Sequence, residues 1–486
     1  MQRIFPVGVY APIRYIIIIA VLILPGWQIM YGQDTTKNVK KSDNKASQQI
    51  QYAKAYSWNI LFKPKTNAAA RKKAITRIQD SLISYFINNH HDTIPKFDRP
   101  VYCPCDTLLI NLNIKFVNGS GGSVSSPLAV ETVKAEGDYL DIQYISNNDP
   151  IKKMEPDINP GPYPKTRSIK LSSLGKANPN NSVLAVIDTG LDTTLFPLNI
   201  SRLLWRRNTS ATGTIYNFLP HKDPYRLKDD HGGRHGTFVT ALALIAYSKG
   251  VTKPTYPRIM ILKALDHNKT GSIFSVSCAL SYARQNNATV VNASLGYYGE
   301  CDSVLLHYIK QCNSKPSNPI LIFAAAGNKL EDRDSAIICK PADPANRLTN
   351  SNTFYPASCS PELNHVITIT GLNKSGKSCY YQNYSNEVVT LGVKNVENDS
   401  LGQILGGCCS YIAPFNKKRY EGSSFATPVA CGMLLRYMLK RDFTTRQLIN
   451  DIAYQGDTPT GNIIYRGTSG VTIDGKYLVF PVKNPF

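Results

Sequence analysis

The sequence predicts an α/β domain in which helices flank both faces of a parallel β-sheet, preceded by a small α+β N-terminal region. Two observations support the main domain. Short apolar runs recur from about residue 182 onward, and helical segments separate several of them. Strands buried on both faces give such continuous apolar runs, and alternation with helices is typical of a parallel sheet. The N-terminal part shows apolar and polar residues in alternation, as half-buried strands do.

The chain has 486 residues, of which 42% are hydrophobic. This length exceeds one ordinary core, so we expect more than one folded unit in a packed protein. The net charge of +21 favours a basic surface exposed to solvent. Nucleic acid is not expected as a partner, because the sequence has no basic stripe interleaved with aromatic residues.

Residues 1–33 have the pattern of a secretory signal peptide. A basic start is followed by the apolar run YIIIIAVLIL and by a small residue, Gly32. The alternative is an uncleaved membrane anchor, but Pro25 and Gly26 interrupt a run that is already short for a membrane span. We therefore expect an exported protein, periplasmic or secreted, that associates with the envelope membrane only if its N-terminus stays uncleaved.

Residues 34–165 form the predicted α+β region. Apolar side chains at helical spacing, among them Ile75, Ile78 and Leu82, predict a helix over 68–89. The segments TLLINLNIKFV and DYLDIQYI alternate as strands do. A stretch rich in Pro and Asn follows and is expected to be a linker.

Residues 166–486 form the predicted main domain. The apolar runs VLAVI, RIMILKA, TVVNASL, PILIFAA and HVITIT are its expected strands. Ligands of parallel α/β sheets gather beyond the carboxyl ends of the strands, so polar residues at these ends are candidate site residues. The chain has eleven cysteines, and Cys431, inside an apolar helical segment, is expected to be a free, packed thiol.

Four motifs stand at such strand ends or at helix starts. They contain Asp188 in VIDTG, His235 in HGT, Asn328 in AAAGN and Ser424 in EGSSFATP. Each has an ordinary structural explanation, respectively a turn aspartate, a histidine at a helix start, a turn-forming asparagine and a helix N-cap. A second histidine, His231, precedes His235 in a glycine-rich approach and is expected to be only its neighbour.

Together the four residues supply the parts of one reaction. Serine becomes a nucleophile when a base removes its proton, and a neutral imidazole can do so near pH 7. A carboxylate holds the imidazole in the required tautomer, and an amide can donate to the oxygen of a tetrahedral intermediate. Asp188, His235 and Ser424 are thus the candidate catalytic residues, and Asn328 is the candidate oxyanion donor.

The chain resembles the subtilisin-like serine proteases, the subtilases, over roughly residues 181–457. The order Asp, His, Ser is theirs, and DTG, HGT, AAGN and GSSFATP each resemble a family motif. The resemblance implies a subtilisin-like fold and a serine endopeptidase that acts on protein or peptide substrates. It also implies a substrate-binding role for residues in NASLGYYG and AAGN, namely Ser294, Leu295, Gly296 and Gly327.

The sequence departs from the family pattern at several positions. Phe238 replaces a usual second histidine, Ser423 replaces a threonine and Phe425 replaces a methionine. No cofactor is expected. Calcium is not supported by a recognised motif, because TTLFPLN stands where many subtilases carry an acidic ligand. The N-terminal region lies where subtilases carry an inhibitory propeptide, although a permanent accessory domain is also open.

Two alternative functions compete with the endopeptidase. A catalytically silent binding protein on this fold would not need all four residues. A sedolisin-like acid peptidase would use a glutamate in place of His235. For an endopeptidase, the small residues 324–327, with Tyr297 and Tyr298 near the rim, indicate a roomy, uncharged first pocket. This would favour large apolar residues before the cut.

Overall fold

The computed structural model describes most of the chain between residues 52 and 440 and two short strands beyond. The described ranges are 52–89, 94–117, 142–147, 150–152, 182–196, 200–206, 214–248, 255–328, 344–372, 378, 381–385, 387–394, 410–412, 419–440, 444, 464–466 and 476–479. The chain divides into two compact units, Met1–Gln49 and Ile50–Phe486, and every described residue belongs to the second. The predicted signal peptide, and most of the predicted linker, lie outside the described residues.

An antiparallel sheet and one helix form the N-terminal part of this unit. The sheet order is β2-β4-β1-β5, with β3 also paired to β4. The helix α1 (Ala68–Asn89) covers one face of the sheet, so the helix predicted over 68–89 is confirmed. Ile75, Ile78 and Leu82 pack there against Trp58 and Ile110. The strands are β1 (Tyr52–Phe62), β2 (Ile94–Phe97), β3 (Val101–Cys103), β4 (Asp106–Val117) and β5 (Ile142–Asn147).

The opposite face of this sheet packs on the main domain. Leu61, Cys103 and Leu109 belong to the same hydrophobic cluster as helices α4 (Ile273–Gln285) and α5 (Ser303–Gln311). A hydrogen bond also joins this sheet to the main domain: the Tyr308 hydroxyl of α5 donates to Oδ2 of Asp106 in β4 at 2.7 Å. The N-terminal α+β region is therefore seated on two helices of the domain that follows it.

The main domain is built on an eight-stranded sheet in the order β18-β19-β15-β14-β12-β10-β7-β8. Neighbouring strands from β8 to β19 run parallel, and β18 is antiparallel to β19. The strands are β7 (Val183–Asp188), β8 (Arg258–Lys263), β10 (Val290–Ala293), β12 (Leu321–Ala325), β14 (Val366–Leu372), β15 (Leu391–Lys394), β18 (Ile464–Arg466) and β19 (Lys476–Val479).

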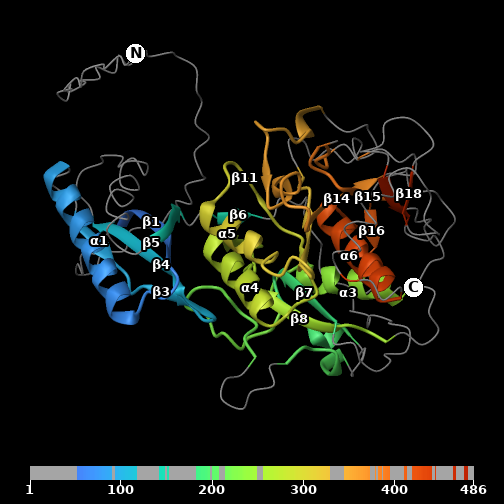
Figure 1. Cartoon of the computed structure of the whole chain (residues 1–486), viewed down its shortest axis with the longest axis horizontal. Helices are drawn as coiled ribbons and strands as arrows, with labels where there is room; N and C mark the ends of the chain where they lie inside the picture. The colour runs from blue at the N-terminus through green and yellow to red at the C-terminus, as the bar shows by residue number, and fades with distance from the viewer. Residues whose placement is uncertain are drawn as a thin grey trace, which may run out of the picture. The chain divides into compact units, whose positions relative to one another are not determined.

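Helices cover both faces of this sheet, as Figure 1 shows. Strand β7 illustrates the layering, because all six of its residues are buried. Leu184 and Val186 face the cluster that contains α3 (His235–Ser248) and α6 (Ser423–Lys440). Ala185 and Ile187 face the cluster that contains α4 and α5. The predicted α/β class, with a parallel sheet between two helical layers, is confirmed.

Short elements connect these layers. They are the strands β6 (Pro150–Lys152), β9 (Thr270–Ser272), β11 (Tyr297–Tyr298), β13 (Phe354–Tyr355), β16 (Ser410–Ile412) and β17 (Arg419–Glu421), and the 3₁₀ turns η1 (Thr193–Leu195), η2 (Ile200–Arg202), η4 (Pro344–Asn346) and η5 (Ala357–Cys359). Strand β6 pairs with β9, so the chain leaving the N-terminal sheet first runs along the main domain.

Helices α3 and α6 lie in close contact along their length. A side chain at Gly432 in α6 would collide with the Ala243 carbonyl oxygen of α3. Cys431, beside this contact, is fully buried and free, as the sequence predicts. His235 is the first residue of α3 and Ser424 is the second residue of α6, so the close contact between the helices fixes the spacing between these two residues.

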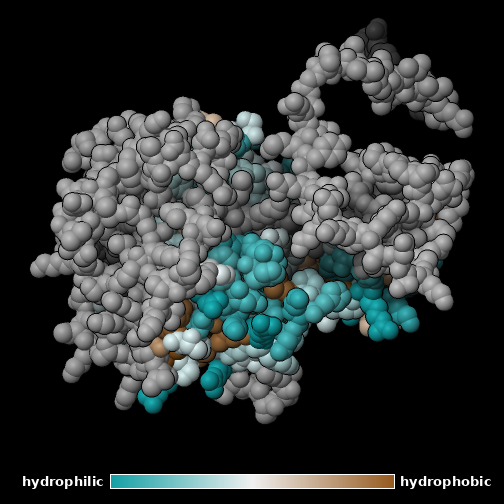
Figure 2. All heavy atoms as spheres, turned by 180° about the vertical axis from the view of Figure 1, so that it is seen from behind, coloured by the Kyte–Doolittle hydropathy of each residue, from teal (hydrophilic) through white to brown (hydrophobic). Residues whose placement is uncertain are grey.

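The exterior is mainly polar where the structure describes it. Figure 2 shows hydrophilic side chains over most of the described part of one face, with hydrophobic side chains in small groups. Tyr102 and Tyr225 are the exposed large hydrophobic residues among the described positions. Within the described ranges, no helix combines the length and the apolar character required to cross a bilayer.

Candidate functional site

The site begins with a buried pair of side chains at the edge of the main sheet. Asp188 is the last residue of β7, and His235 is the first residue of α3. The imidazole Nδ1 lies 2.9 Å from Oδ1 of Asp188, and Asp188 and His235 are only 1% and 3% exposed. A carboxylate in this position favours the tautomer with the proton on Nδ1 and leaves Nε2 as the basic nitrogen.

Two glycines allow the strand end and the helix start to approach each other. A Cβ on Gly236 would overlap the carbonyl oxygen of Gly190. Gly190 has φ +112° and lies against the carbonyl oxygen of Leu227, which a Cβ would approach to 2.6 Å. Residues other than glycine rarely adopt that backbone conformation. The contact between Asp188 and His235 therefore depends on the absence of side chains at both positions.

Backbone and side-chain donors hold the aspartate end of the pair. The Thr189 amide donates to Oδ1 of Asp188 at 2.8 Å, and the Thr189 hydroxyl accepts from the Gly236 amide at 2.9 Å. The ammonium of Lys263 donates to the Thr189 carbonyl and to Oδ1 of Asp230, the latter at 2.6 Å. Lys263 is 2% exposed, and it brings a positive charge next to this acidic edge.

A second buried carboxylate, Asp229, lies beside the pair and was not anticipated from the sequence. Its Oδ2 accepts from the Thr237 amide at 2.9 Å and from the Thr237 hydroxyl at 2.7 Å. Burial raises the pKa of Asp229 to about 6, although the bonds from Thr237 act in the opposite direction. In the sequence, the neighbouring acids Asp229 and Asp230 before the glycines 232 and 233 could have indicated this site. Two acids in an exposed turn would give the same pattern, however.

His231 lies directly next to His235. Its Nδ1 accepts a hydrogen bond from the His235 backbone amide at 3.3 Å. That amide is one of the donors at the start of α3 that have no partner within the helix, so His231 acts as a side-chain cap. It bonds to the backbone of His235, whereas Asp188 bonds to the imidazole, and the two contacts serve different purposes.

Ser424 lies in the first turn of α6 and directly precedes Phe425. The Phe425 ring packs on the imidazole of His235, with ring centroids 5.0 Å apart, so the start of α6 lies near this imidazole. The Ser424 carbonyl accepts from the Ser294 hydroxyl at 2.8 Å, which ties the helix start to the segment after β10. Ser424 is 4% exposed. The structure thus brings the candidate base and the candidate nucleophile to one edge of the sheet.

Asn328 is joined to the same helix start. Its Oδ1 accepts from the Ser423 amide at 3.0 Å, so the oxygen of the side-chain amide faces α6 and the NH₂ group is turned away from that contact. Ser423 also bonds to both polar backbone atoms of Gly327 through its hydroxyl. Ser423, which in the sequence is only a departure from the family pattern, therefore links the Asn328 segment to Ser424.

The candidate substrate-binding residues follow two neighbouring parallel strands, Ser294–Gly296 after β10 and Gly327 after β12. The structure contradicts the expectation of a roomy pocket between them. A Cβ on Gly296 would overlap Cε1 and Cζ of Phe354, and a Cβ on Gly327 would lie 2.8 Å from Cδ1 of the same ring. Small residues in the wall indicated open space, but an aromatic side chain from another segment packs against them.

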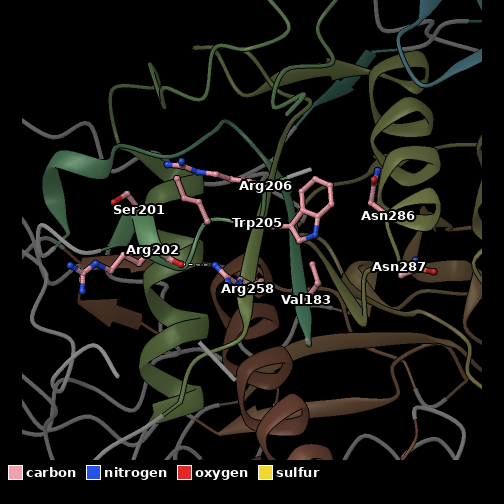
Figure 3. Close-up of a pocket in the computed structure, with 9 residues that line it drawn as sticks. Val183, Ser201, Arg202, Trp205, Arg206, Arg258, Asn286 and Asn287 are labelled. Carbon is pink, nitrogen blue, oxygen red and sulfur yellow. Dashed lines mark hydrogen bonds between the residues drawn. The ribbon is translucent and has the colours of Figure 1, made fainter. Parts of the chain in front are cut away.

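A separate hollow of about 710 Å³ lies at the other end of the strands. It is lined in part by Val183 and Arg258, the first residues of β7 and β8, whereas Asp188 is the last residue of β7. Figure 3 shows Arg202, Arg206 and Trp205 around it, with Arg258 donating to the Arg202 carbonyl at 2.7 Å. This basic hollow is not part of the site described above.

In the part of the chain that the structure describes, no group of three or more His, Cys, Asp or Glu residues is placed to hold a metal ion. The polar groups around Asp188 instead satisfy one another through hydrogen bonds. Their arrangement can hold an imidazole as a base next to a serine at a helix start.

A sequence model described as the subtilase family, Peptidase_S8, matches residues 180–453, which is more than half of the chain. The chain belongs to the subtilase family. The match includes all four candidate residues, from Asp188 to Ser424.

Known subtilases are similar at low identity. The thermophilic serine proteinase of Bacillus sp. (strain AK1) is 26% identical over 283 residues, which cover 56% of each chain. Subtilisin E of Bacillus subtilis (strain 168) is 25% identical over 300 residues, which cover 60% of this chain and 65% of subtilisin E. This chain thus spans less than two thirds of the length of these relatives.

A solved structure is similar in fold over a larger part of this chain. A serine-to-alanine mutant of the epidermin leader peptide processing serine protease from Staphylococcus aureus matches with a TM-score of 0.53 at 14% identity. The match covers 87% of this chain and 98% of that protein. At this identity the likeness concerns the fold alone.

This subtilase has an aromatic cluster where a second histidine is usual in the family. Phe238 packs on Phe425 and on Tyr420, with ring centroids 5.0 and 5.1 Å apart. Phe425 in turn contacts the imidazole of His235. These rings exclude water from one side of His235 and restrict the movement of its ring.

Asp229→Asn should flatten the dependence of stability on pH. The pKa of Asp229 is raised from 3.8 to about 6 in the folded protein. The contribution of this carboxyl group to the free energy of unfolding is therefore fully present below about pH 4. It is lost as pH rises through about 6, by up to about 3 kcal/mol. Urea unfolding at pH 4 and pH 7 measures this difference in wild type and variant.

Asp223→Asn is the matched control, because Asp223 is exposed in the same loop. It should follow the wild-type pH dependence. An unchanged pH dependence in Asp229→Asn would show that the buried carboxylate does not titrate in this range.

Proposed function

We propose that this subtilase is a serine endopeptidase that hydrolyses protein or peptide substrates through Asp188, His235 and Ser424. The observation that carries the proposal is the buried 2.9 Å contact between Asp188 and Nδ1 of His235, next to a serine in the first turn of α6. A buried ion-pairing group of this kind is costly unless it has partners. Its placement at the sheet edge is explained by catalysis more readily than by stability.

The proposed reaction starts with proton transfer from the Ser424 hydroxyl to Nε2 of His235. The serine oxygen attacks the carbonyl carbon of the scissile peptide, and a tetrahedral intermediate forms. The imidazolium then gives its proton to the departing amine, which leaves an acyl group on Ser424. Water hydrolyses this ester by the same route, with His235 again acting as base. Asp188 stabilises the imidazolium in both halves.

The oxyanion is stabilised by donors on the Asn328 side of the site. The side-chain NH₂ group of Asn328 and the backbone amide of Ser424 are the proposed donors. The Asn328 amide is oriented by its bond to the Ser423 amide, so it is fixed before the substrate binds. The start of α6 adds the positive end of a helix dipole at the same place. Donors that are fixed in advance stabilise the transition state without reorganisation.

A catalytically silent protein on this fold is the weaker alternative. A scaffold that only binds does not need a buried carboxylate at Asp188, which here requires the bonds from Thr189 and Lys263 to compensate for its lost hydration. The similar protein of Bacillus sp. (strain AK1) is named a serine proteinase, which supports the same conclusion.

We propose an exported protein, periplasmic or secreted. The N-terminal sequence supports this, and so does the name of another similar subtilase, the cell wall-associated protease of Bacillus subtilis (strain 168), which is 26% identical over 261 residues. If the N-terminus stays uncleaved, we propose that it holds the protein at the envelope membrane. We propose no nucleic-acid partner.

We also propose that the N-terminal region assists folding and is then removed by the enzyme itself. Three contacts support this role. The sheet is seated on α4 and α5, Asp106 accepts from Tyr308, and β6 pairs with β9. The chain that follows β6 is the proline-rich stretch expected as a linker, which is the segment to be cut.

The direct test is labelling with a fluorophosphonate, which reacts only with an activated serine. Wild type should be labelled at Ser424. His235→Ala should remove labelling and lower kcat by about 10⁶, the magnitude known for the corresponding residue of subtilisin. His231→Ala, the matched control, should keep most of the activity, because His231 bonds to the backbone of His235 and not to its ring. Labelling of the His235→Ala variant at the wild-type rate would refute the proposal.

Asn328→Ala should lower kcat by about 10²–10³ with little change in KM, as for the corresponding donor of subtilisin. The donor acts mainly on the oxyanion, so substrate binding in the ground state is little affected. Kinetics with titrated active sites measures kcat. If Asn328 is only a turn former, thermal stability will fall and kcat of the folded fraction will not.

Ser424→Ala should accumulate as a longer chain than wild type. Self-removal requires the nucleophile, so the variant should retain the N-terminal region while wild type loses roughly residues 34–165. Intact mass of the two purified proteins measures this. Equal masses would mean that the region is a permanent accessory domain.

A further inference from the structure

In the proposed reaction the side chain before the cut enters between Ser294–Gly296 and Gly327, and we call the space between these residues the groove. The scissile carbonyl lies between the Ser424 hydroxyl and the Asn328 amide in the proposed reaction. Gly327 directly precedes Asn328, and Ser294 is bonded to the Ser424 carbonyl. The substrate residue that carries this carbonyl is thus placed between the two glycines, Gly296 and Gly327.

The ring of Phe354 already occupies the space between these glycines. Its Cε1 atom meets the Cβ position of Gly296 and lies 2.9 Å from that of Gly327. One atom of the ring therefore touches both walls. Phe354 is itself only 3% exposed, so the ring is packed inside the protein between the two glycines.

Neighbouring residues hold the ring in this position. The Tyr298 ring packs edge-on against Phe354, with centroids 4.9 Å apart, and the Tyr298 hydroxyl bonds to the Asn383 side chain. The Asn383 amide donates in turn to the Ala326 carbonyl at 2.8 Å. Strands β11 and β13 pair directly through Tyr298 and Phe354. The ring cannot turn out of the groove without breaking this set of contacts.

We propose that Phe354 is the residue that sets specificity before the cut and that it restricts this position to glycine and alanine. The inference rests on the proposed endopeptidase function. A larger side chain would have to displace a packed ring, and protein interiors resist such overpacking. Residues 294–296, 327 and 354, which line the groove, carry no charge, so neither lysine nor arginine gains a partner there.

The test compares peptide p-nitroanilides that differ only in the residue before the anilide: Gly, Ala, Leu or Phe. For wild type, kcat/KM should be at least about tenfold higher with Ala than with Phe. Phe354→Gly should open the groove and reverse this order, with the largest gain for Phe. Phe354→Leu retains an apolar core side chain and should give an intermediate profile, which guards against misfolding of the glycine variant.

Active sites are titrated with the fluorophosphonate before each measurement. Wild type that prefers Leu or Phe would overturn the inference while leaving the proposed function intact. The same holds if both Phe354 variants keep the wild-type order. Wild type that neither reacts with the fluorophosphonate nor cleaves any anilide would instead refute the proposed function. The two failures are therefore distinguishable.

Discussion

The contact between Asp188 and His235 is the constraint on which the rest of the site depends. A carboxylate this deeply buried is stable only when nearby groups compensate for its lost hydration. Thr189 supplies an amide donor, His235 supplies the imidazole, and Lys263 supplies a positive charge through the Thr189 carbonyl. The parallel sheet makes these contacts possible, because it brings the carboxyl ends of β7 and β8, and with them Asp188 and Lys263, to one edge.

The two reacting groups are carried by two helices that pack on each other. Each is in the first turn of its helix, and the close contact at Gly432 fixes the distance between the helices far from the chemistry. Ser294, Ser423 and Asn328 then join the start of α6 to the ends of β10 and β12. Residues from three separate parts of the sequence are thus positioned by hydrogen bonds between neighbouring element ends.

The fold class and the four motif residues could be predicted from sequence because they depend on local rules. Apolar runs mark buried strands, and the spacing in α1 marks a helix. The burial of Asp229 and Lys263 could not be predicted, because it arises only when loops from different strands meet. Phe354 was missed for a similar reason. Small residues in one segment suggest open space, but the ring that fills it comes from a segment 27 residues further along the chain than Gly327.

The aromatic residue after the nucleophile has a consequence for chemical durability. Many subtilases carry a methionine at this position, and thioethers are readily oxidised to sulfoxides by peroxides. Phe425 has no sulfur, and its ring covers the imidazole of His235. In the described part of α6 the thioethers belong to Met433 and Met438, which are 8% and 2% exposed and lie two or more turns beyond Ser424. A peroxide that reaches the start of α6 therefore finds no thioether in the helical turn that carries the reacting serine.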